Sequence, residues 1–383
     1  MSFQDNKKKI FLLLSNHRSL KGIRQQKDII KRSFERINEY ELIETYNIIP
    51  NQLNIIIEEL NIDLVNYLIK IKKNHKDTKL IIFVTEYLVQ SFFGKQLNTF
   101  DIKTKISHLY LIKCLNIPFV NFIKVKNSFE KFKRDYFLRN LIEKIIIYPL
   151  SLILDRDGLG NVIDISRREY CLKKAKNLFD LCISNSAPVN SSYKKFFNCE
   201  IILLPTYIDK TKSIKARNNF LKSNKQYIPG MFFSGRLTKY RKKLLSKFWH
   251  INSLYPYELL NYQSSINNFK NGKLKEIPLY EIYIKQEKNW PYSSPMRTLL
   301  SIEEGFIPIN VGQFNDHSLN QLAINISPNA TTEELCKFFV NIDINEAFKS
   351  LDILVEEHNK TEDILKDDFC LALNNLNNQQ KSL

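Results

Sequence analysis

A short stretch near residue 295 gathers the side chains that could best hold an anionic ligand. Ser294 is suited to cap a helix, Pro295 to occupy its first position and Gly305 to end it, so a helix is expected from about residue 295 to 304. Four polar side chains lie at its head: Tyr292, Ser293, Ser294 and Arg297. Free helix-end amides, hydroxyls and a forked guanidinium are groups that bind a diphosphate. The alternative is a well-capped structural helix with Arg297 exposed.

A second basic segment follows the strand predicted at residues 231–234. Gly235 lets the backbone turn closely after that strand, and Arg236 and Arg241 come next. On charge pattern alone, Arg241 and the lysines after it form a solvated helix face, which is the usual fate of such a run.

Metal chemistry has weaker support. Asp155 and Asp157 form an Asp-x-Asp triplet that can bind a divalent cation, but Gly158 and Gly160 follow and suit a plain turn. The six cysteines include no C-x-x-C pair, which argues against a zinc site and against a disulfide framework. We therefore expect neither a metal nor a cofactor.

The two basic segments resemble the donor-binding half of GT-B glycosyltransferases, particularly the exostosin-like type and the bacterial enzymes of surface-polysaccharide synthesis. Residues 293–309, "SSPMRTLLSIEEGFIPI", are similar to that family's serine and arginine, helix, and Gly-x-Ile-Pro leading into a strand. Residues 231–245, "MFFSGRLTKYRKKLL", are similar to the strand that opens the C-terminal domain and ends in Gly-Arg.

The resemblance implies an α/β chain with two Rossmann-like domains facing a cleft, and C-terminal helices crossing back. It also implies that Arg236 and Arg241 point towards this interdomain cleft. It implies a metal-independent, hexosyltransferase-like enzyme. The substrate would be a nucleotide-sugar donor, and the acceptor a glycan or a lipid-linked glycan in cell-surface polysaccharide synthesis. The donor diphosphate would be bound by Arg236, Ser294 and Arg297, with Gly235, Arg241, Tyr292 and Ser293 beside them.

One position departs from the family pattern. The family often places a glutamate three residues after the arginine, where it holds the donor ribose, and here that position is Leu300. Glu304 shares a helix face with Arg297 and could substitute. Leu300 also supports another interpretation, a GT-B-like protein that has lost catalysis and binds a glycan or a partner.

An inverting enzyme of this kind needs a base near the acceptor hydroxyl, from loops of the N-terminal domain. His17 lies in the loop after the first predicted strand, and the pKa of a histidine suits a base near neutral pH. Glu86 follows the strand predicted at residues 79–85. A surface histidine and an exposed or helix-capping carboxylate are the ordinary alternatives.

Strands and helices alternate in the way that parallel β-α-β units require. Strands are expected at residues 9–14, 79–85, 178–184 and 200–204, with a helix at about 22–40. We predict an N-terminal acceptor-side domain at 1–205, a polar linker at 206–228, a nucleotide-sugar domain at 229–330 and C-terminal helices at 331–383. The second domain has predicted strands at 231–234, 280–285, 307–311 and 323–326.

The composition is globular, with 44% hydrophobic and 25% charged residues, and the net charge is +17. That charge favours an anionic partner. A nucleic-acid-binding α/β protein is the alternative function, although no zinc finger, helix-turn-helix or aromatic RNA-binding motif is present. Phe129, Phe132 and Tyr136 form a stripe in a basic segment that could dock on an anionic membrane, or simply pack in the core. With no signal peptide and no spanning run, we expect a cytoplasmic protein, peripheral at most on the inner membrane face.

Overall fold

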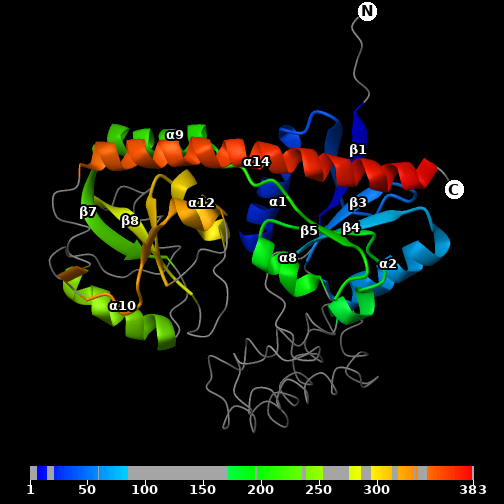
Figure 1. The fold of residues 1–383 in the computed structure, drawn as a ribbon, viewed down its shortest axis with the longest axis horizontal. Helices are drawn as coiled ribbons and strands as arrows, with labels where there is room; N and C mark the ends of the chain where they lie inside the picture. Colours follow the sequence, from blue (N-terminus) through cyan, green and yellow to red (C-terminus); the bar gives the residue numbers. More distant parts are fainter. Residues whose placement is uncertain are drawn as a thin grey trace, which may run out of the picture. The chain divides into compact units, whose positions relative to one another are not determined.

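The computed structural model describes residues 7–14, 21–58, 60–84, 171–194, 196–234, 239–252, 276–285, 295–312, 318–331, 333–334 and 343–381. The chain divides into two compact units (Figure 1). Unit 1 contains Met1–Ser184, Val189–Ile202 and Cys370–Leu383, and unit 2 contains Asn185–Pro188 and Leu203–Phe369. Each unit holds one sheet, so the prediction of an α/β chain with two Rossmann-like domains is confirmed.

Unit 1 is built on a six-stranded sheet in the order β2-β1-β3-β4-β5-β6. The strands are β1 (Lys8–Leu13), β2 (Tyr40–Thr45), β3 (Leu53–Ile57), β4 (Lys79–Val84), β5 (Leu181–Ser184) and β6 (Glu200–Leu203). The pairings from β2 to β5 are all parallel. β3 is buried along its whole length and β4 from Leu80 onward, as parallel strands covered by helices must be. The strand order reverses between β1 and β3, which is where open α/β sheets bind ligands.

The helices of unit 1 include α1 (Lys21–Glu35), α2 (Ile62–Asn74) and α8 (Ala187–Tyr193). α1 buries Ile29, Ile30 and Phe34. The helix predicted at about 22–40 is therefore present but ends earlier, because Tyr40 begins β2. The sequence analysis missed β2 and β3.

Unit 2 has a four-stranded parallel sheet in the order β10-β9-β8-β7. The strands are β7 (Gln226–Phe233), β8 (Glu276–Ile284), β9 (Ile307–Val311) and β10 (Ile324–Ile326). The strands predicted in this half are present, and β7 and β8 begin earlier than predicted. The described helices of this unit include α9 (Lys210–Lys222), α10 (Lys239–Asn252) and α12 (Pro295–Glu303), with a 3-10 helix η2 at Ser318–Leu322.

The segment 206–228, predicted to be a linker, instead contains α9 and the start of β7. Asp209 caps α9, and its carboxylate accepts the Lys212 amide at 2.9 Å. Some of the polar side chains that suggested a linker are in fact buried. The Ser213 hydroxyl donates to the Ile302 carbonyl at 2.7 Å, and the Arg217 guanidinium donates to both oxygens of Asp352 at 2.8 and 3.0 Å. The polar composition of this segment was therefore a misleading sign of a linker, because the partners of its polar side chains lie far away in the sequence.

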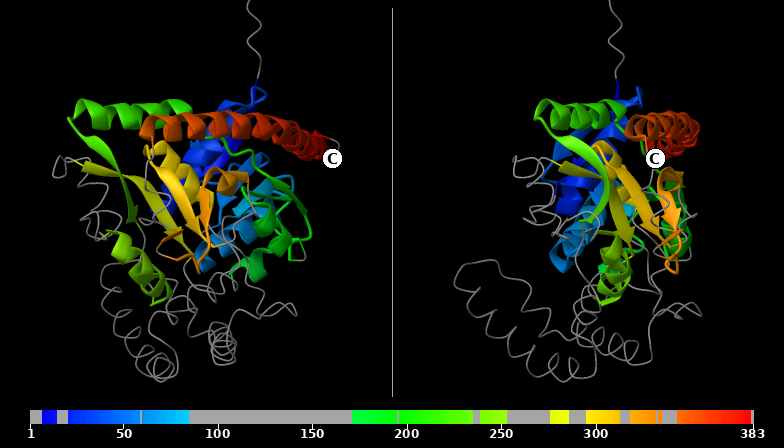
Figure 2. Two further views of the ribbon diagram at one scale, coloured as in Figure 1. Left: turned by 60° about the vertical axis from the view of Figure 1, so that its left-hand side comes forward. Right: turned by 90° about the vertical axis from the view of Figure 1, so that its left-hand side faces the viewer.

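The chain closes with the 38-residue helix α14 (Ile344–Lys381), about 57 Å long at about 1.5 Å per residue. Its residues up to Phe369 belong to unit 2, and those from Cys370 belong to unit 1. Within unit 2, α14 lies beside α9 (Figure 2), and the two helices are joined by ion pairs of Lys210 with Glu356 and of Arg217 with Asp352. In the described part of the chain, no helix has the length and the apolar character needed to cross a bilayer.

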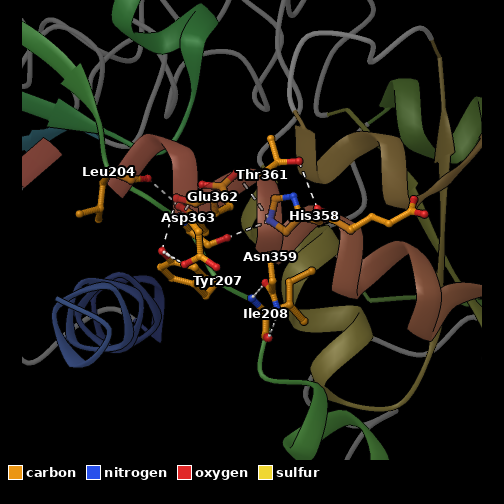
Figure 3. A network of polar contacts seen from close by, with 10 residues as sticks. Leu204, Tyr207, Ile208, His358, Asn359, Thr361, Glu362 and Asp363 are labelled. Atoms are coloured by element: carbon orange, nitrogen blue, oxygen red, sulfur yellow. Dashed lines mark hydrogen bonds and ion pairs between the residues drawn. The ribbon is translucent and has the colours of Figure 1, made fainter. Parts of the chain in front are cut away.

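Within unit 2, α14 also holds the strand-like stretch that follows β6 (Figure 3). The Asn359 carboxamide bonds the amide and the carbonyl of Ile208, each at 3.0 Å. Glu362 accepts the Thr206 amide at 2.8 Å, and His358 Nε2 lies 2.9 Å from the Thr206 carbonyl. Burial lowers the pKa of His358, which favours the neutral ring, and Nε2 is the donor because a carbonyl oxygen can only accept. Backbone groups that lack a strand partner are thus satisfied by side chains of one helix.

Candidate functional site

The helix α12 covers one face of the unit 2 sheet. Strand register places Phe232, Glu281 and Pro308 in one row of that face, and Tyr283 and Asn310 in the next. Phe306, just after α12, packs its ring 4.7 Å from that of Phe232. The sheet face that α12 covers therefore carries polar side chains towards the carboxyl ends of the strands, where α/β proteins place their functional sites.

Arg297 lies in the first turn of α12, and its guanidinium carbon is 5.4 Å from the centre of the Tyr283 ring. This cation–π contact fixes the charge over the end of β8 while the side chain stays partly exposed. The predicted helix is present, with its start at Pro295 as expected. A charge held at a helix N-terminus above a sheet edge is suited to an anionic group.

A buried carboxyl, Glu281, lies below Arg297 on the same face. The Ser234 hydroxyl donates to it from the end of β7. Burial raises the pKa of Glu281, while the hydrogen bond from Ser234 and the charge of Arg297 oppose that rise. Glu304 raises the pKa further, which places its charge near Glu281. The sequence analysis missed Glu281, although an acidic residue inside the apolar run 277–284 is a signal that could have singled it out.

The two consecutive glutamates after α12 have different surroundings. Glu303 is buried and accepts the Lys212 ammonium at 2.8 Å and the Asp209 amide at 3.3 Å. Glu304 is partly exposed and acts on the Glu281 side. Of the two, Glu304, the residue predicted to substitute for the family's ribose contact, is the more exposed.

The structure does not bring Arg241 to the Arg297 site. Arg241 is 6% exposed, lies 5.5 Å from the Phe233 ring centre and donates from Nε to the Ile284 carbonyl at 2.9 Å. Since Phe233 pairs with Ile282, its ring lies on the face opposite to Tyr283. Arg241 is therefore neither the solvated residue nor the neighbour of Arg297 that the sequence analysis considered. It holds α10 against the end of β8.

Unit 1 carries a buried carboxylate at the corresponding edge of its own sheet. Glu58 directly follows β3, is 8% exposed and accepts the Tyr193 hydroxyl at 2.6 Å. Tyr193 is fully buried and stacks on Phe197 with ring centres 5.3 Å apart. The reversal of strand order between β1 and β3 puts Glu58 where ligands bind in such sheets. An acid immediately after an apolar strand is a signal that the sequence analysis did not use.

Several predicted site residues lie outside the described residues: His17, Glu86, Gly235, Arg236, Tyr292, Ser293 and Ser294. The same holds for Asp155, Asp157 and the basic stripe with Phe129, Phe132 and Tyr136. Within the ranges that the structure does describe, no group of three or more His, Cys, Asp or Glu side chains is placed to hold a metal ion.

Comparisons with known proteins give weak likenesses. No protein-family model and no curated protein sequence matches the chain. A solved glycosyltransferase from Rickettsia africae ESF-5 is similar at 11% identity and a TM-score of 0.37, covering 94% of this chain and 98% of that one. A UDP-forming α,α-trehalose-phosphate synthase from Burkholderia vietnamiensis is similar at 7% identity and a TM-score of 0.34, covering 97% of each chain.

Proposed function

We propose that this protein is a GT-B-type glycosyltransferase that takes a sugar from a nucleotide-sugar donor. The observation that carries the proposal is Arg297, held on Tyr283 at the head of α12 and at the carboxyl end of the unit 2 sheet. The matching residues of the sequence, the α12 segment with its Gly-x-Ile-Pro and the strand before Gly235, support the same family. The α/β architecture of both units agrees with it.

In this proposal the donor diphosphate binds the free amides of α12 and the guanidinium of Arg297, with Ser294 and Arg236 as further ligands. The bond between the sugar and the diphosphate breaks as the acceptor oxygen bonds the sugar carbon. The nucleoside diphosphate leaves with the negative charge, which Arg297 and the helix end stabilise. No metal is needed for this stabilisation, because a fixed cation and a helix end provide it.

The acceptor hydroxyl must lose a proton, and unit 1 provides the candidates. We propose His17 or Glu86 as the base, and add Glu58 because of its place beside the strand-order reversal. The acceptor is a glycan or a lipid-linked glycan of cell-surface polysaccharide synthesis. We propose that the protein acts in the cytoplasm, where its net charge of +17 would favour binding to the anionic inner face of the membrane.

A thermal-shift titration with UDP, GDP, CMP and their sugar conjugates tests the donor site, because a ligand of the folded state raises the melting temperature. We expect one nucleotide to raise it, and Arg297→Ala to weaken that binding about tenfold to hundredfold. Lys215→Ala, an exposed change on α9, is the matched control and should bind like the wild type. Because Arg297→Ala also removes a packing contact, its shift is compared with its own unliganded melting temperature.

Two other results would point elsewhere. No shift with any nucleotide at millimolar concentration, together with salt-dependent binding to nucleic acid, would favour the nucleic-acid-binding alternative for this basic chain. Nucleotide binding without any hydrolysis or transfer of the donor sugar would favour a non-catalytic binding protein, as Leu300 allows.

A further inference from the structure

Asn310, in β9, is a buried polar side chain whose carboxamide has no hydrogen-bond partner among the described residues. It is fully buried, and neither its carboxamide oxygen nor its nitrogen bonds any residue that the structure describes. Buried polar groups in folded proteins are almost always satisfied, so such an exception requires an explanation. A ligand that binds at this place is one explanation.

The neighbours of Asn310 belong to the α12 site. Tyr283, its register partner in β8, carries the guanidinium of Arg297 on its ring. On the other side, the register partner in β10 is Asn325, which is exposed. This row of side chains thus runs from beneath Arg297 to solvent at the edge strand.

We propose that Asn310 binds the nucleoside part of the nucleotide at the α12 site, an inference that rests on the proposed function. A carboxamide offers an acceptor oxygen and a donor nitrogen side by side. A phosphate only accepts hydrogen bonds, so it cannot satisfy the oxygen. The complementary ligand group carries a donor beside an acceptor, as do the amide edge of a nucleobase and the hydroxyls of ribose. This chain has Leu300 where the family has its ribose-binding glutamate, so Asn310 in β9 would provide the contact with the nucleoside instead.

A buried water molecule is the competing explanation, since waters commonly satisfy isolated polar groups in protein interiors. The two explanations differ in what an apolar replacement does. If a ligand satisfies Asn310, Asn310→Leu removes an unsatisfied amide from the free protein, so its unliganded melting temperature stays the same or rises. If an ordered water satisfies it, the same change lowers the melting temperature and leaves nucleotide affinity unchanged.

The experiment measures nucleotide affinity by calorimetry, and melting temperature without ligand, for the wild type, Asn310→Leu and the control Asn218→Leu on the exposed side of α9. We expect Asn310→Leu to bind the nucleotide about tenfold or more weakly while melting no lower than the wild type. Asn218→Leu should bind like the wild type. Unchanged affinity in Asn310→Leu, with a wild type that binds, overturns the inference alone. A wild type that binds no nucleotide overturns the proposed function and this inference together.

Ligand analogues identify the group that Asn310 binds, and they also serve if Asn310→Leu does not fold. The wild type is titrated with 2′-deoxy and 3′-deoxy nucleotides and with a nucleotide methylated on the base amide edge. Loss of affinity with a deoxy analogue assigns the contact to ribose, and loss with the methylated base assigns it to the base. In either case Asn310→Leu should bind that analogue and the unmodified nucleotide with equal affinity. Equal binding of all analogues by the wild type overturns the inference.

Discussion

Replacing Gly305 by alanine should destabilise unit 2 through the end of α12. Gly305 has a φ of +88°, in the left-handed region, and its amide closes the helix by donating to the Ile302 carbonyl at 3.0 Å. A methyl group there would lie 3.1 Å from the Tyr227 hydroxyl and 3.2 Å from Arg217 Cγ. The Tyr227 hydroxyl cannot move freely, because it donates to the Gly305 carbonyl at 2.8 Å.

The magnitude follows from three contributions. The left-handed backbone costs about 1–2 kcal/mol for alanine, and crowding against buried neighbours costs about 1–2 kcal/mol more. Reduced freedom of the unfolded chain offsets about 0.4–1 kcal/mol. The net loss is about 2 kcal/mol, which lowers the melting temperature of a unit of this size by about 4–8 °C.

Thermal and urea denaturation of Gly305→Ala measures this loss, and Asn224→Ala separates its parts. Asn224 also has a positive φ, 55°, but is exposed, so its replacement carries the backbone contribution without the crowding. We expect Gly305→Ala to lose about 1 kcal/mol more than Asn224→Ala. Equal losses would refute the crowding argument, and a melting temperature within about 1 °C of the wild type would refute the whole reasoning.

Three further predictions concern charges in unit 2. The pKa of Glu281 is raised in the folded state, so its contribution to the free energy of unfolding is lost as pH rises above 4.5. Glu281→Gln should therefore flatten the pH dependence of urea unfolding above pH 4.5. An unchanged pH profile would contradict the raised pKa. Because the pKa of His358 is lowered below 6.5, stability should fall on acidification from about pH 7.5 to about pH 5.5, and His358→Gln should lose less over that range than the wild type. Asp352→Asn leaves Arg217 largely buried without its charge partner, so the free energy of unfolding should fall by about 2–4 kcal/mol; a loss below about 0.5 kcal/mol would show that the pair contributes little.

Local signals predicted α12 well. Its start, its end and the position of Arg297 follow from Pro295 and Gly305, residues whose preferences act within a few positions of the chain. The strand β4 was predicted for a similar reason, because its hydrophobic run from Leu80 to Val84 is unbroken.

Features that depend on distant partners were not predicted. α9 resembled a linker because the acid that its Arg217 needs, Asp352, lies 135 residues away. Glu281 accepts a hydrogen bond from Ser234, which lies 47 positions earlier at the end of β7, so no local pattern shows that it is buried. Arg241 belonged to a basic run that usually points to solvent, but its burial, its contact with Phe233 and its bond to the Ile284 carbonyl show that it does not.

The division of α14 between the two units has a consequence for how the chain is made. In unit 1, the Asn374 carboxamide oxygen accepts the Tyr40 hydroxyl at 2.8 Å and the Lys8 ammonium at 2.5 Å, contacts between residues 334 and 366 positions apart. Phe369, Ala372, Leu373 and Leu376 of α14 are buried. During synthesis, β1 and β2 leave the ribosome long before these partners exist. Unit 1 therefore gains its Asn374 contacts only after residue 374 has been made, and a chain released before that point would lack the hydrogen bonds of Tyr40 and Lys8 to this helix.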